Sequence, residues 1–540
     1  MRNIVLICSL FLFCSILNAQ QDAWVYLADK ENVSAAIANP ISILSQKAID
    51  RKNLHGILID SRDVPVNENY ITQLKNASGI LVMAKSKWFN AVHVRGSQSD
   101  IQSLASLSFV NGVDFADKTL SIKQKKAIHT AKQSKLENTS ATFNYGNSSN
   151  QIEMIKGDDL HLLDYTGTGM TVAVIDAGFP NANTMGAFAR FRNTGNLLGS
   201  YDFVNRDTDV FTNTTSNHGT LVLSTMVGYI ENEFVGTAPD AAYYLFITED
   251  ATSENPVEES YWVEAAERAD SLGVDVINTS LGYTTYDNPN YSHTPNDMDG
   301  NTTYITRGAN IAFEKGLLLI NSAGNSGSAG NPWQIIGAPA DAEGVFSIGA
   351  VDSNGNYASF SSKGNATQSN QKPDVVAQGQ ASSVITENNI VSTANGTSFS
   401  GPIMAGGLVC LWQALPNKTN AEIMQLVRTS ASQYTTPDNF LGYGIPDLQL
   451  ALNTSLSVTD FKTQDISVYP NPTHSLINFN FSDNKKDIDV VLYNILGEEI
   501  LISKVSITQN SMDVSTLPNG LYILKFNSNG STKSIKIIKN

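Results

Sequence analysis

The chain has 540 residues, a length typical of about three or four domains. It carries 35 Lys and Arg residues against 51 Asp and Glu residues, which gives a formal net charge of −16. This acidic balance argues against nucleic acid as a partner, because phosphate binding needs a basic surface. An apolar fraction of 41% excludes a wholly disordered chain.

The first segment, residues 1–19, has the pattern of a secretory signal peptide. Arg2 precedes an apolar run over residues 4–17, and the small residue Ala19 follows it. A membrane anchor is the alternative, but the run is shorter than the roughly 20 apolar residues that a span needs. Removal of this segment would leave Cys410 as the only cysteine, so we expect no internal disulfide in the mature chain.

Residues 20–117 have the pattern of a small α+β domain. We expect strands at residues 24–27, 56–59, 79–83 and 90–94 and a short helix at residues 101–107. The region shows no acid–base pair and no metal-ligand spacing. The segment 118–150 is polar and rich in lysine, which predicts an exposed linker that a protease could cut.

Residues 151–455 alternate short apolar strands with helices. The expected strands include residues 170–175, 274–277, 316–320 and 345–348, and the expected helices include residues 261–272 and 304–315. Continuous apolar strands between helices are typical of a parallel sheet covered on both faces. We therefore predict an α/β fold with a doubly wound, mostly parallel sheet.

After a short linker at residues 456–466, apolar residues recur at every second position. Ile477, Phe479 and Phe481 alternate with polar residues. Val490 and Leu492 share a face, as do Ile535 and Ile537, and Ile523 and Phe526 share one less strictly. Glycines punctuate these runs. The pattern predicts a C-terminal all-β sandwich over residues 467–540.

Three segments of the α/β region carry residue types that suit nucleophilic catalysis. Asp176 ends a predicted strand, and the carboxyl ends of such strands are where open α/β sheets place their sites. His218 and Ser398 each begin an apolar helix. A serine hydroxyl needs a base to take its proton, an imidazole can be that base, and a buried carboxylate can orient the imidazole.

A fourth segment adds a hydrogen-bond donor for an oxyanion. Asn325 follows the strand at 316–320, and its side-chain NH2 group could stabilise negative charge together with the free N–H groups at the start of the Ser398 helix. Each residue alone has a common structural explanation as a turn, cap or core residue. Their joint occurrence in the order Asp, His, Asn, Ser predicts a hydrolytic site.

The same segments resemble the subtilisin-like serine proteases (peptidase family S8) over about 300 residues. The matching order of Asp, His and Ser is that of subtilisin and not of chymotrypsin. The motifs that carry the resemblance are Val174-Ile175-Asp176, His218-Gly219-Thr220, Asn278-Thr279-Ser280-Leu281-Gly282, Ala323-Gly324-Asn325, Ala358-Ser359-Phe360-Ser361-Ser362 and Gly396-Thr397-Ser398.

The resemblance implies a role for each matched residue. Asp176 would orient the base His218, Ser398 would be the nucleophile, and Asn325 would share the oxyanion with the Ser398 N–H group. The segment Ser280, Leu281 and Gly282 would pair with the substrate backbone as an added strand. The first specificity pocket would have these three residues, with Ala323, Gly324 and Asn325, as walls and Gly337 near its floor.

The chain departs from the family pattern at three positions. Phe399 stands where the family usually has Met, Ile403 where it has His, and Gln378 where it has Pro. We expect none of the three to touch the chemistry, so we expect activity to be kept. A catalytically silent, surface-binding protein on the same fold is the alternative function, and the presence of all four chemical residues disfavours it.

The two flanking regions also resemble known modules. Residues 20–117 resemble the inhibitory propeptide of such proteases, which implies a zymogen; an accessory domain that stays attached is the alternative. Residues 467–540 resemble the sorting domain of the type IX secretion system, on Tyr469-Pro470-Asn471-Pro472 and Leu517-Pro518-Asn519-Gly520-Leu521. That implies export across both membranes, to the medium or the cell surface, with the secretion machinery as partner. A carbohydrate- or surface-binding module is the alternative.

A metal site is the least specific prediction. Asp297, Asp299 and Asn301 alternate around a glycine as in part of a calcium loop, but no Glu closes the loop. A solvated surface loop is the favoured interpretation, and a structural calcium stays open because relatives often bind one. We therefore expect a secreted serine endopeptidase that acts on polypeptides, needs no cofactor for its chemistry, binds no nucleic acid and is a monomer.

Overall fold

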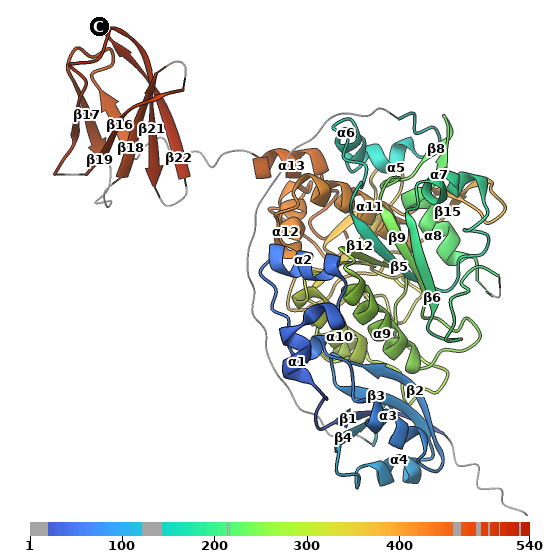
Figure 1. The fold of residues 1–540 in the computed structure, drawn as a ribbon. Coiled ribbons are helices and arrows are strands. Elements are labelled where there is room, and N and C mark those ends of the chain that lie inside the picture. The colour runs from blue at the N-terminus through green and yellow to red at the C-terminus, as the bar shows by residue number, and fades with distance from the viewer. Residues whose placement is uncertain are drawn as a thin grey trace, which may run out of the picture. The chain divides into compact units, whose positions relative to one another are not determined.

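The computed structural model describes residues 20–120, 143–212, 214, 216–456, 466–481, 488–494, 497–506, 508–528 and 531–540. The predicted signal peptide and most of the two predicted linkers lie outside these residues. The chain divides into one compact unit up to Leu452 and a second unit from Asn453 (Figure 1). Within the described residues, no helix is both long and apolar enough to cross a membrane.

A sheet of seven parallel strands forms the centre of the first unit, in the order β13-β12-β11-β10-β5-β9-β6. Successive residues of a strand enter different cores: Val172 and Val174 pack on one face, and Ala173 and Ile175 pack on the other. This burial on both faces explains the continuous apolar runs and confirms the predicted α/β fold. The strands are β5 (Thr171–Asp176), β6 (Leu197–Asp202), β9 (Ala242–Ile247), β10 (Val276–Thr279), β11 (Leu318–Ser322), β12 (Val345–Val351) and β13 (Val375–Gln378).

Helices cover both faces of this sheet. On one face lie α8 (His218–Val227) and α11 (Thr397–Ala414), and on the other lie α9 (Val257–Leu272) and α10 (Tyr304–Glu314) (Figure 1). α11 is apolar all round because it is buried along almost its whole length. The remaining elements of this part are α5 (Ser149–Glu153), α6 (Gly157–His161), α7 (Ala189–Asn193), α12 (Asn420–Ser430), α13 (Leu448–Leu456), β7 (Tyr229–Ile230), β8 (Phe234–Val235), β14 (Ser382–Ile385) and β15 (Val391–Ala394).

The N-terminal region forms an antiparallel sheet, in the order β2-β3-β1-β4, which packs against α9 and α10 (Figure 1). Trp24 stacks on Tyr304 of α10 with ring centroids 4.6 Å apart, and its indole N–H donates to Ser260 Oγ of α9 at 2.8 Å. The elements are β1 (Gln21–Leu27), β2 (Ile80–Ser86), β3 (Ala91–Gly96), β4 (Val110–Phe115), α1 (Val33–Ala38), α2 (Gln46–Leu54), α3 (Glu68–Lys75) and α4 (Gln98–Leu104).

One predicted strand of this region is wrong. Residues 56–59 belong to no strand and lie between α2 and a short 3-10 helix at Ser61–Asp63. Both edges of β1 are already paired, with β3 and β4. The apolar side chain of Ile57 instead packs on Gly316 before β11, where a Cβ atom would lie only 2.0 Å from Ile57 Cδ1. Its hydrophobicity therefore reflects contact with the α/β part and not a strand.

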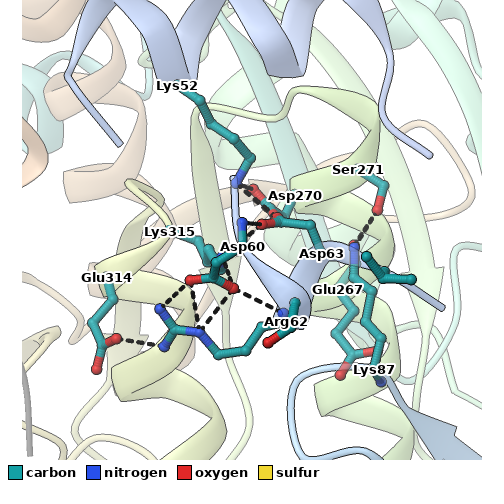
Figure 2. A network of polar contacts seen from close by, with 12 residues as sticks. Lys52, Asp60, Arg62, Asp63, Lys87, Glu267, Asp270, Ser271, Glu314 and Lys315 are labelled. Atoms are coloured by element: carbon teal, nitrogen blue, oxygen red, sulfur yellow. Dashed lines mark hydrogen bonds and ion pairs between the residues drawn. The ribbon is translucent and has the colours of Figure 1, made fainter. Parts of the chain in front are cut away.

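A buried ionic cluster fastens α2 and the 3-10 helix to the ends of α9 and α10 (Figure 2). We call it the polar clamp; it consists of Arg51, Lys52 and Asp63 with Asp270 and Lys315. Lys52 Nζ lies 2.8 Å from Asp270 Oδ1, Arg51 Nη2 lies 2.5 Å from the same oxygen, and Lys315 Nζ lies 2.7 Å from Asp63 Oδ2. All five side chains are almost fully buried, so each charge depends on its partners.

The polar clamp lies at the amino ends of the central strands. Arg51 also donates to the carbonyl oxygen of Val274, just before β10, at 2.5 Å. Lys47 of α2 pairs with Asp275 at 3.0 Å. Asp176, by contrast, ends β5, so the clamp and the predicted catalytic residues lie at opposite edges of the sheet.

The second unit contains two antiparallel sheets, β16-β17-β20 and β19-β18-β21-β22, with one apolar core. Ile477, Phe479 and Phe526 are buried in this core, which agrees with the predicted all-β module. Ile523 is 41% exposed whereas Phe526 is buried, so the expectation that these two residues loosely share a face is wrong; β21 turns Tyr522, Leu524 and Phe526 inward. The strands are β16 (Ile466–Tyr469), β17 (Leu476–Phe481), β18 (Ile488–Asn494), β19 (Glu499–Val505), β20 (Ser511–Asp513), β21 (Gly520–Ser528) and β22 (Ser531–Lys539).

Candidate active site

Asp176 and His218 meet at the carboxyl end of the central sheet. Asp176 is the last residue of β5, and His218 is the first residue of α8. His218 Nδ1 lies 2.8 Å from Asp176 Oδ1, which also accepts the Ala177 N–H group at 2.8 Å. A Cβ atom at Gly219 would lie 2.4 Å from the Gly178 carbonyl oxygen, so the helix approaches this closely only with glycine there.

The surroundings of His218 favour its protonated form. Burial alone would lower the pKa of His218, but the charge of Asp176, its hydrogen bond and the charge of Glu249 outweigh burial and raise that pKa above its ordinary 6.5. Asp176 is completely buried, whereas 31% of the His218 side chain is exposed. The imidazole is therefore held on the Nδ1 side by a carboxylate and open to solvent elsewhere.

Ser398 is the second residue of α11 and is 8% exposed. Its hydroxyl donates to the Ser280 carbonyl oxygen at 3.4 Å, and the Ser280 hydroxyl donates to the Ser398 carbonyl oxygen at 3.1 Å. The neighbouring Phe399 ring lies 6.1 Å from the His218 ring, which places the first turn of α11 beside the imidazole. The hydrogen bond that the structure gives the Ser398 hydroxyl thus goes to Ser280 and not to His218.

Asn325 is fixed by the start of α11. Its Oδ1 atom accepts from the Thr397 N–H group at 2.9 Å and from the Thr397 hydroxyl at 3.1 Å. Nδ2 remains as the donor end of the amide, and a Cβ atom at Gly396 would lie 3.4 Å from it. The Ser398 N–H group lies between the N–H groups of Thr397 and Phe399, which donate to Asn325 Oδ1 and to the Gly396 carbonyl oxygen. The arrangement therefore brings a side-chain donor and the Ser398 N–H group to the same end of α11.

A cavity of about 180 Å³ adjoins Ser398 and Asn325. All five residues predicted for substrate binding line it: Ser280, Leu281, Gly282, Ala323 and Gly324. Gly337, predicted near its floor, also lines it. Thr284, Ile335 and Ser362 also line it, although the sequence predicted none of them as a substrate-binding residue; Ser362 ends the matched motif at residues 358–362, whereas no motif marks Thr284 or Ile335.

The backbone at residues 280–282 is fixed by hydrogen bonds to neighbouring segments, and part of it stays exposed to solvent. Asn321 Nδ2 donates to the Leu281 carbonyl oxygen at 3.0 Å. Tyr283 and Ala338 exchange backbone hydrogen bonds of 2.8 and 3.2 Å as an isolated antiparallel bridge. Gly282 is exposed. An extended peptide could therefore add along this segment, which we call the substrate strand.

The three departures from the family pattern differ in their placement. Ile403 is fully buried in α11, and Gln378 at the end of β13 accepts from Asn150 Nδ2 at 2.7 Å. Phe399, however, contacts His218, so the expectation that none of the three touches the chemistry is wrong for this residue. The reason is the helical turn: the residue after Ser398 projects toward α8.

The candidate calcium ligands are engaged elsewhere. Asp297 Oδ2 lies 2.8 Å from Lys118 Nζ, so a cationic side chain already neutralises it. Asp299 accepts from the N–H groups of Asn301 and Thr302 at 2.9 and 2.8 Å. In the described part of the chain, no three His, Cys, Asp or Glu side chains cluster as metal ligands. These residues therefore fit a hydrogen-bonded loop better than a calcium site.

Three family models match successive parts of the chain. Residues 22–134 match the peptidase S8 propeptide domain of Bacteroidota, and residues 167–444, just over half of the chain, match the subtilase family. Residues 467–540 match the secretion system C-terminal sorting domain. These matches follow the same order as the modules predicted from the sequence.

Individual proteins are similar over the α/β part. Subtilisin E of Bacillus subtilis (strain 168) is 29% identical over 302 residues, which cover 56% of this chain and 70% of that protein. Subtilisin of Bacillus pumilus is also 29% identical over 302 residues, covering 56% of this chain and 97% of that protein. Among solved structures, MycP1 from the ESX-1 type VII secretion system is 22% identical with a TM-score of 0.43, and the match covers 59% of this chain and 90% of that one.

Proposed function

The chain belongs to the subtilase family and is a subtilisin-like serine endopeptidase, and we propose that Asp176, His218 and Ser398 carry out its chemistry. The observation that carries this proposal is the 2.8 Å hydrogen bond between Asp176 and His218 beside the first turn of the Ser398 helix. A carboxylate that holds Nδ1 leaves Nε2 as the basic nitrogen.

The reaction requires one local rotation. The Ser398 hydroxyl turns from the Ser280 carbonyl oxygen toward His218, gives its proton to Nε2, and its Oγ atom bonds to the substrate carbonyl carbon. The resulting oxyanion accepts hydrogen bonds from Asn325 Nδ2 and the Ser398 N–H group. His218 then gives the proton to the leaving amine, the C–N bond breaks, and water releases the acyl group by the same route.

The environment of the cleft supports broad peptide binding. An extended substrate would pair with the substrate strand, and its side chain would enter the cavity beside Ser398. The residues that line this cavity are small, polar or apolar, and none is charged. We therefore propose an apolar or broad side-chain preference and no cofactor in the chemistry.

The flanking regions set the context of the enzyme. The sorting-domain match shows that the protein is exported, to the medium or the cell surface. The propeptide-domain match is consistent with a zymogen. We propose that residues 20–117 keep the enzyme inactive until the linker is cut, that a signal peptide precedes them, and that residues 467–540 contact the secretion machinery.

This proposal is tested by labelling with a fluorophosphonate. The activated serine oxygen of the enzyme bonds to the phosphorus of this reagent and displaces fluoride. Secreted wild-type protein and its Ser398→Ala variant are compared by intact mass. Labelling of the wild type alone supports the triad. A wild type that stays unlabelled even after deletion of residues 20–117 would identify a silent binding protein instead.

Replacing Asn325 by leucine is expected to lower kcat roughly 10²- to 10³-fold with little change in KM, because the amide acts on the oxyanion and not on the bound substrate. Steady-state kinetics on a peptide p-nitroanilide give both constants. Since Asn325 also accepts hydrogen bonds from Thr397, the melting temperature is measured as a control for the start of α11. An unchanged kcat would contradict the assignment of Asn325.

The activity is expected to rise with pH through a midpoint above 6.5. His218 must be neutral to act as a base, and its pKa is raised, so the active fraction grows only as the pH passes that raised value. The measurement is kcat/KM between pH 5 and 9, which reports the free enzyme. A midpoint clearly below 6.5 would show that Asp176 does not stabilise the imidazolium.

A further inference from the structure

Glu249 follows the strand that lies beside Asp176, and no motif of the sequence marks it. It comes two residues after β9, the strand that pairs with β5 and aligns Ile247 with Asp176. The intervening Thr248 donates its N–H group to the Asp176 carbonyl oxygen at 3.3 Å. The backbone that carries Glu249 is thus tied directly to the residue that orients His218.

The Glu249 side chain reaches across to the substrate strand. Its Oε1 atom accepts a hydrogen bond from the hydroxyl of Tyr283, the residue that directly follows Gly282. The Tyr283 side chain is buried, and its backbone is bridged to Ala338 on the other side. Tyr283 therefore fixes one end of the substrate strand at two points, and Glu249 is one of them.

Glu249 is also electrostatically coupled to the catalytic pair. The pKa of Glu249 is raised to about 8: burial is the largest influence, the charges of Glu254 and Asp176 act in the same direction, and the Tyr283 hydrogen bond and the charge of His218 act against them. Glu249 is therefore mostly neutral at neutral pH, and it raises the pKa of His218 only where it is ionised. Glu258, whose carboxylate accepts from the N–H groups of Asp250 and Asn255, faces Glu249 as well.

We propose that Glu249 and Tyr283 form a brace that positions the substrate strand relative to His218. Glu249 is then a positioning residue that acts on the substrate through Tyr283. The inference rests on the proposed peptidase function and names two residues of its binding machinery. It predicts that substrate binding depends on the hydrogen bond between the two side chains.

The hydrogen bond is tested with Tyr283→Phe and a matched control, Tyr286→Phe. Tyr286 lies three residues further along, is also buried, and donates to Glu259 at 2.5 Å. Both variants lose a buried hydroxyl bonded to a carboxylate, so both should lose similar stability. Only Tyr283→Phe is expected to raise KM for an extended peptide p-nitroanilide, roughly 5- to 20-fold, with kcat changed less than about twofold.

The acceptor of this hydrogen bond is tested with Glu249→Gln and Glu249→Ala. The amide oxygen of glutamine still accepts from Tyr283, so KM should stay within about twofold of the wild type. Alanine removes the acceptor, so KM should rise as it does in Tyr283→Phe.

Two outcomes would overturn the brace. One is a KM that rises no more in Tyr283→Phe than in Tyr286→Phe, and the other is a KM in Glu249→Ala that stays at the value of Glu249→Gln. Ser398-dependent hydrolysis by the processed wild type is measured first, so that a failure of the proposed function is seen separately. Absence of that hydrolysis would refute the function and the brace together. Normal hydrolysis by the wild type, with no difference in KM between each variant and its control, would refute the brace alone.

Discussion

Replacing Ser398 by alanine is expected to lower kcat for peptide hydrolysis roughly 10⁶-fold, the size of loss that removal of this serine causes in subtilisin itself. The methyl group that remains cannot form the acyl intermediate, so the residual rate comes only from the oxyanion donors and substrate binding. Burst kinetics and steady-state turnover of a peptide p-nitroanilide measure the loss. KM is expected to stay close to that of the wild type, because the substrate strand and the cavity are intact.

The matched control for this substitution is Ser400→Ala in the same helix. Ser400 is fully buried, and its hydroxyl donates to the Thr397 carbonyl oxygen at 3.1 Å, two residues from the nucleophile. Its loss should cost some stability but little turnover. If self-cleavage removes the N-terminal region, Ser398→Ala should also accumulate with that region attached. Equal losses of kcat in both variants would show that the helix, and not the Ser398 hydroxyl, carries the effect.

Replacing Asp270 by alanine is expected to weaken the attachment of the N-terminal region by about 3–5 kcal/mol, roughly 150- to 5,000-fold in the binding constant. Asp270 is fully buried and neutralises both Arg51 and Lys52, whose side chains are 3% and 0% exposed. Its pKa lies well below the usual range: burial alone would raise it, but the charges of Lys52 and Arg51 outweigh burial. Without the carboxylate, two buried cations lose their partner.

The measurement uses the Ser398→Ala background, so that the enzyme does not digest its own fragments. The lysine-rich segment 121–142 is cut with an added protease, and the two products are separated by size-exclusion chromatography. The N-terminal fragment should co-elute with the rest of the chain unless Asp270 is replaced. The control is Glu68→Ala, because its pair with Lys85 is exposed and such pairs contribute about 0–1 kcal/mol. Undiminished co-elution in Asp270→Ala would show that the polar clamp does not hold this region.

Much of the architecture could be predicted because its signals are local. Strands such as β5 and β11 are buried on both faces, so their apolar runs are visible in a few consecutive residues. The helices that begin at His218 and Thr397 are likewise visible locally, because a short run of polar and glycine residues directly precedes or opens each apolar helix. The segment at 56–59 shows the limit: a short apolar run fits a strand or a packed loop, and only the packing of Ile57 on Gly316 in the tertiary structure distinguishes the two.

By itself, the sequence determined the order of the modules, the family and the four residue types that suit peptide hydrolysis. Only the tertiary structure decided which groups meet. The contact between Phe399 and His218, the brace between Glu249 and Tyr283 and the polar clamp between Lys52 and Asp270 each join different elements. Such contacts depend on how helices and strands pack, whereas periodicity and motifs record only what neighbours along the chain require. A carboxylate such as Glu249 therefore looks like a surface residue until the fold brings it beside the substrate strand.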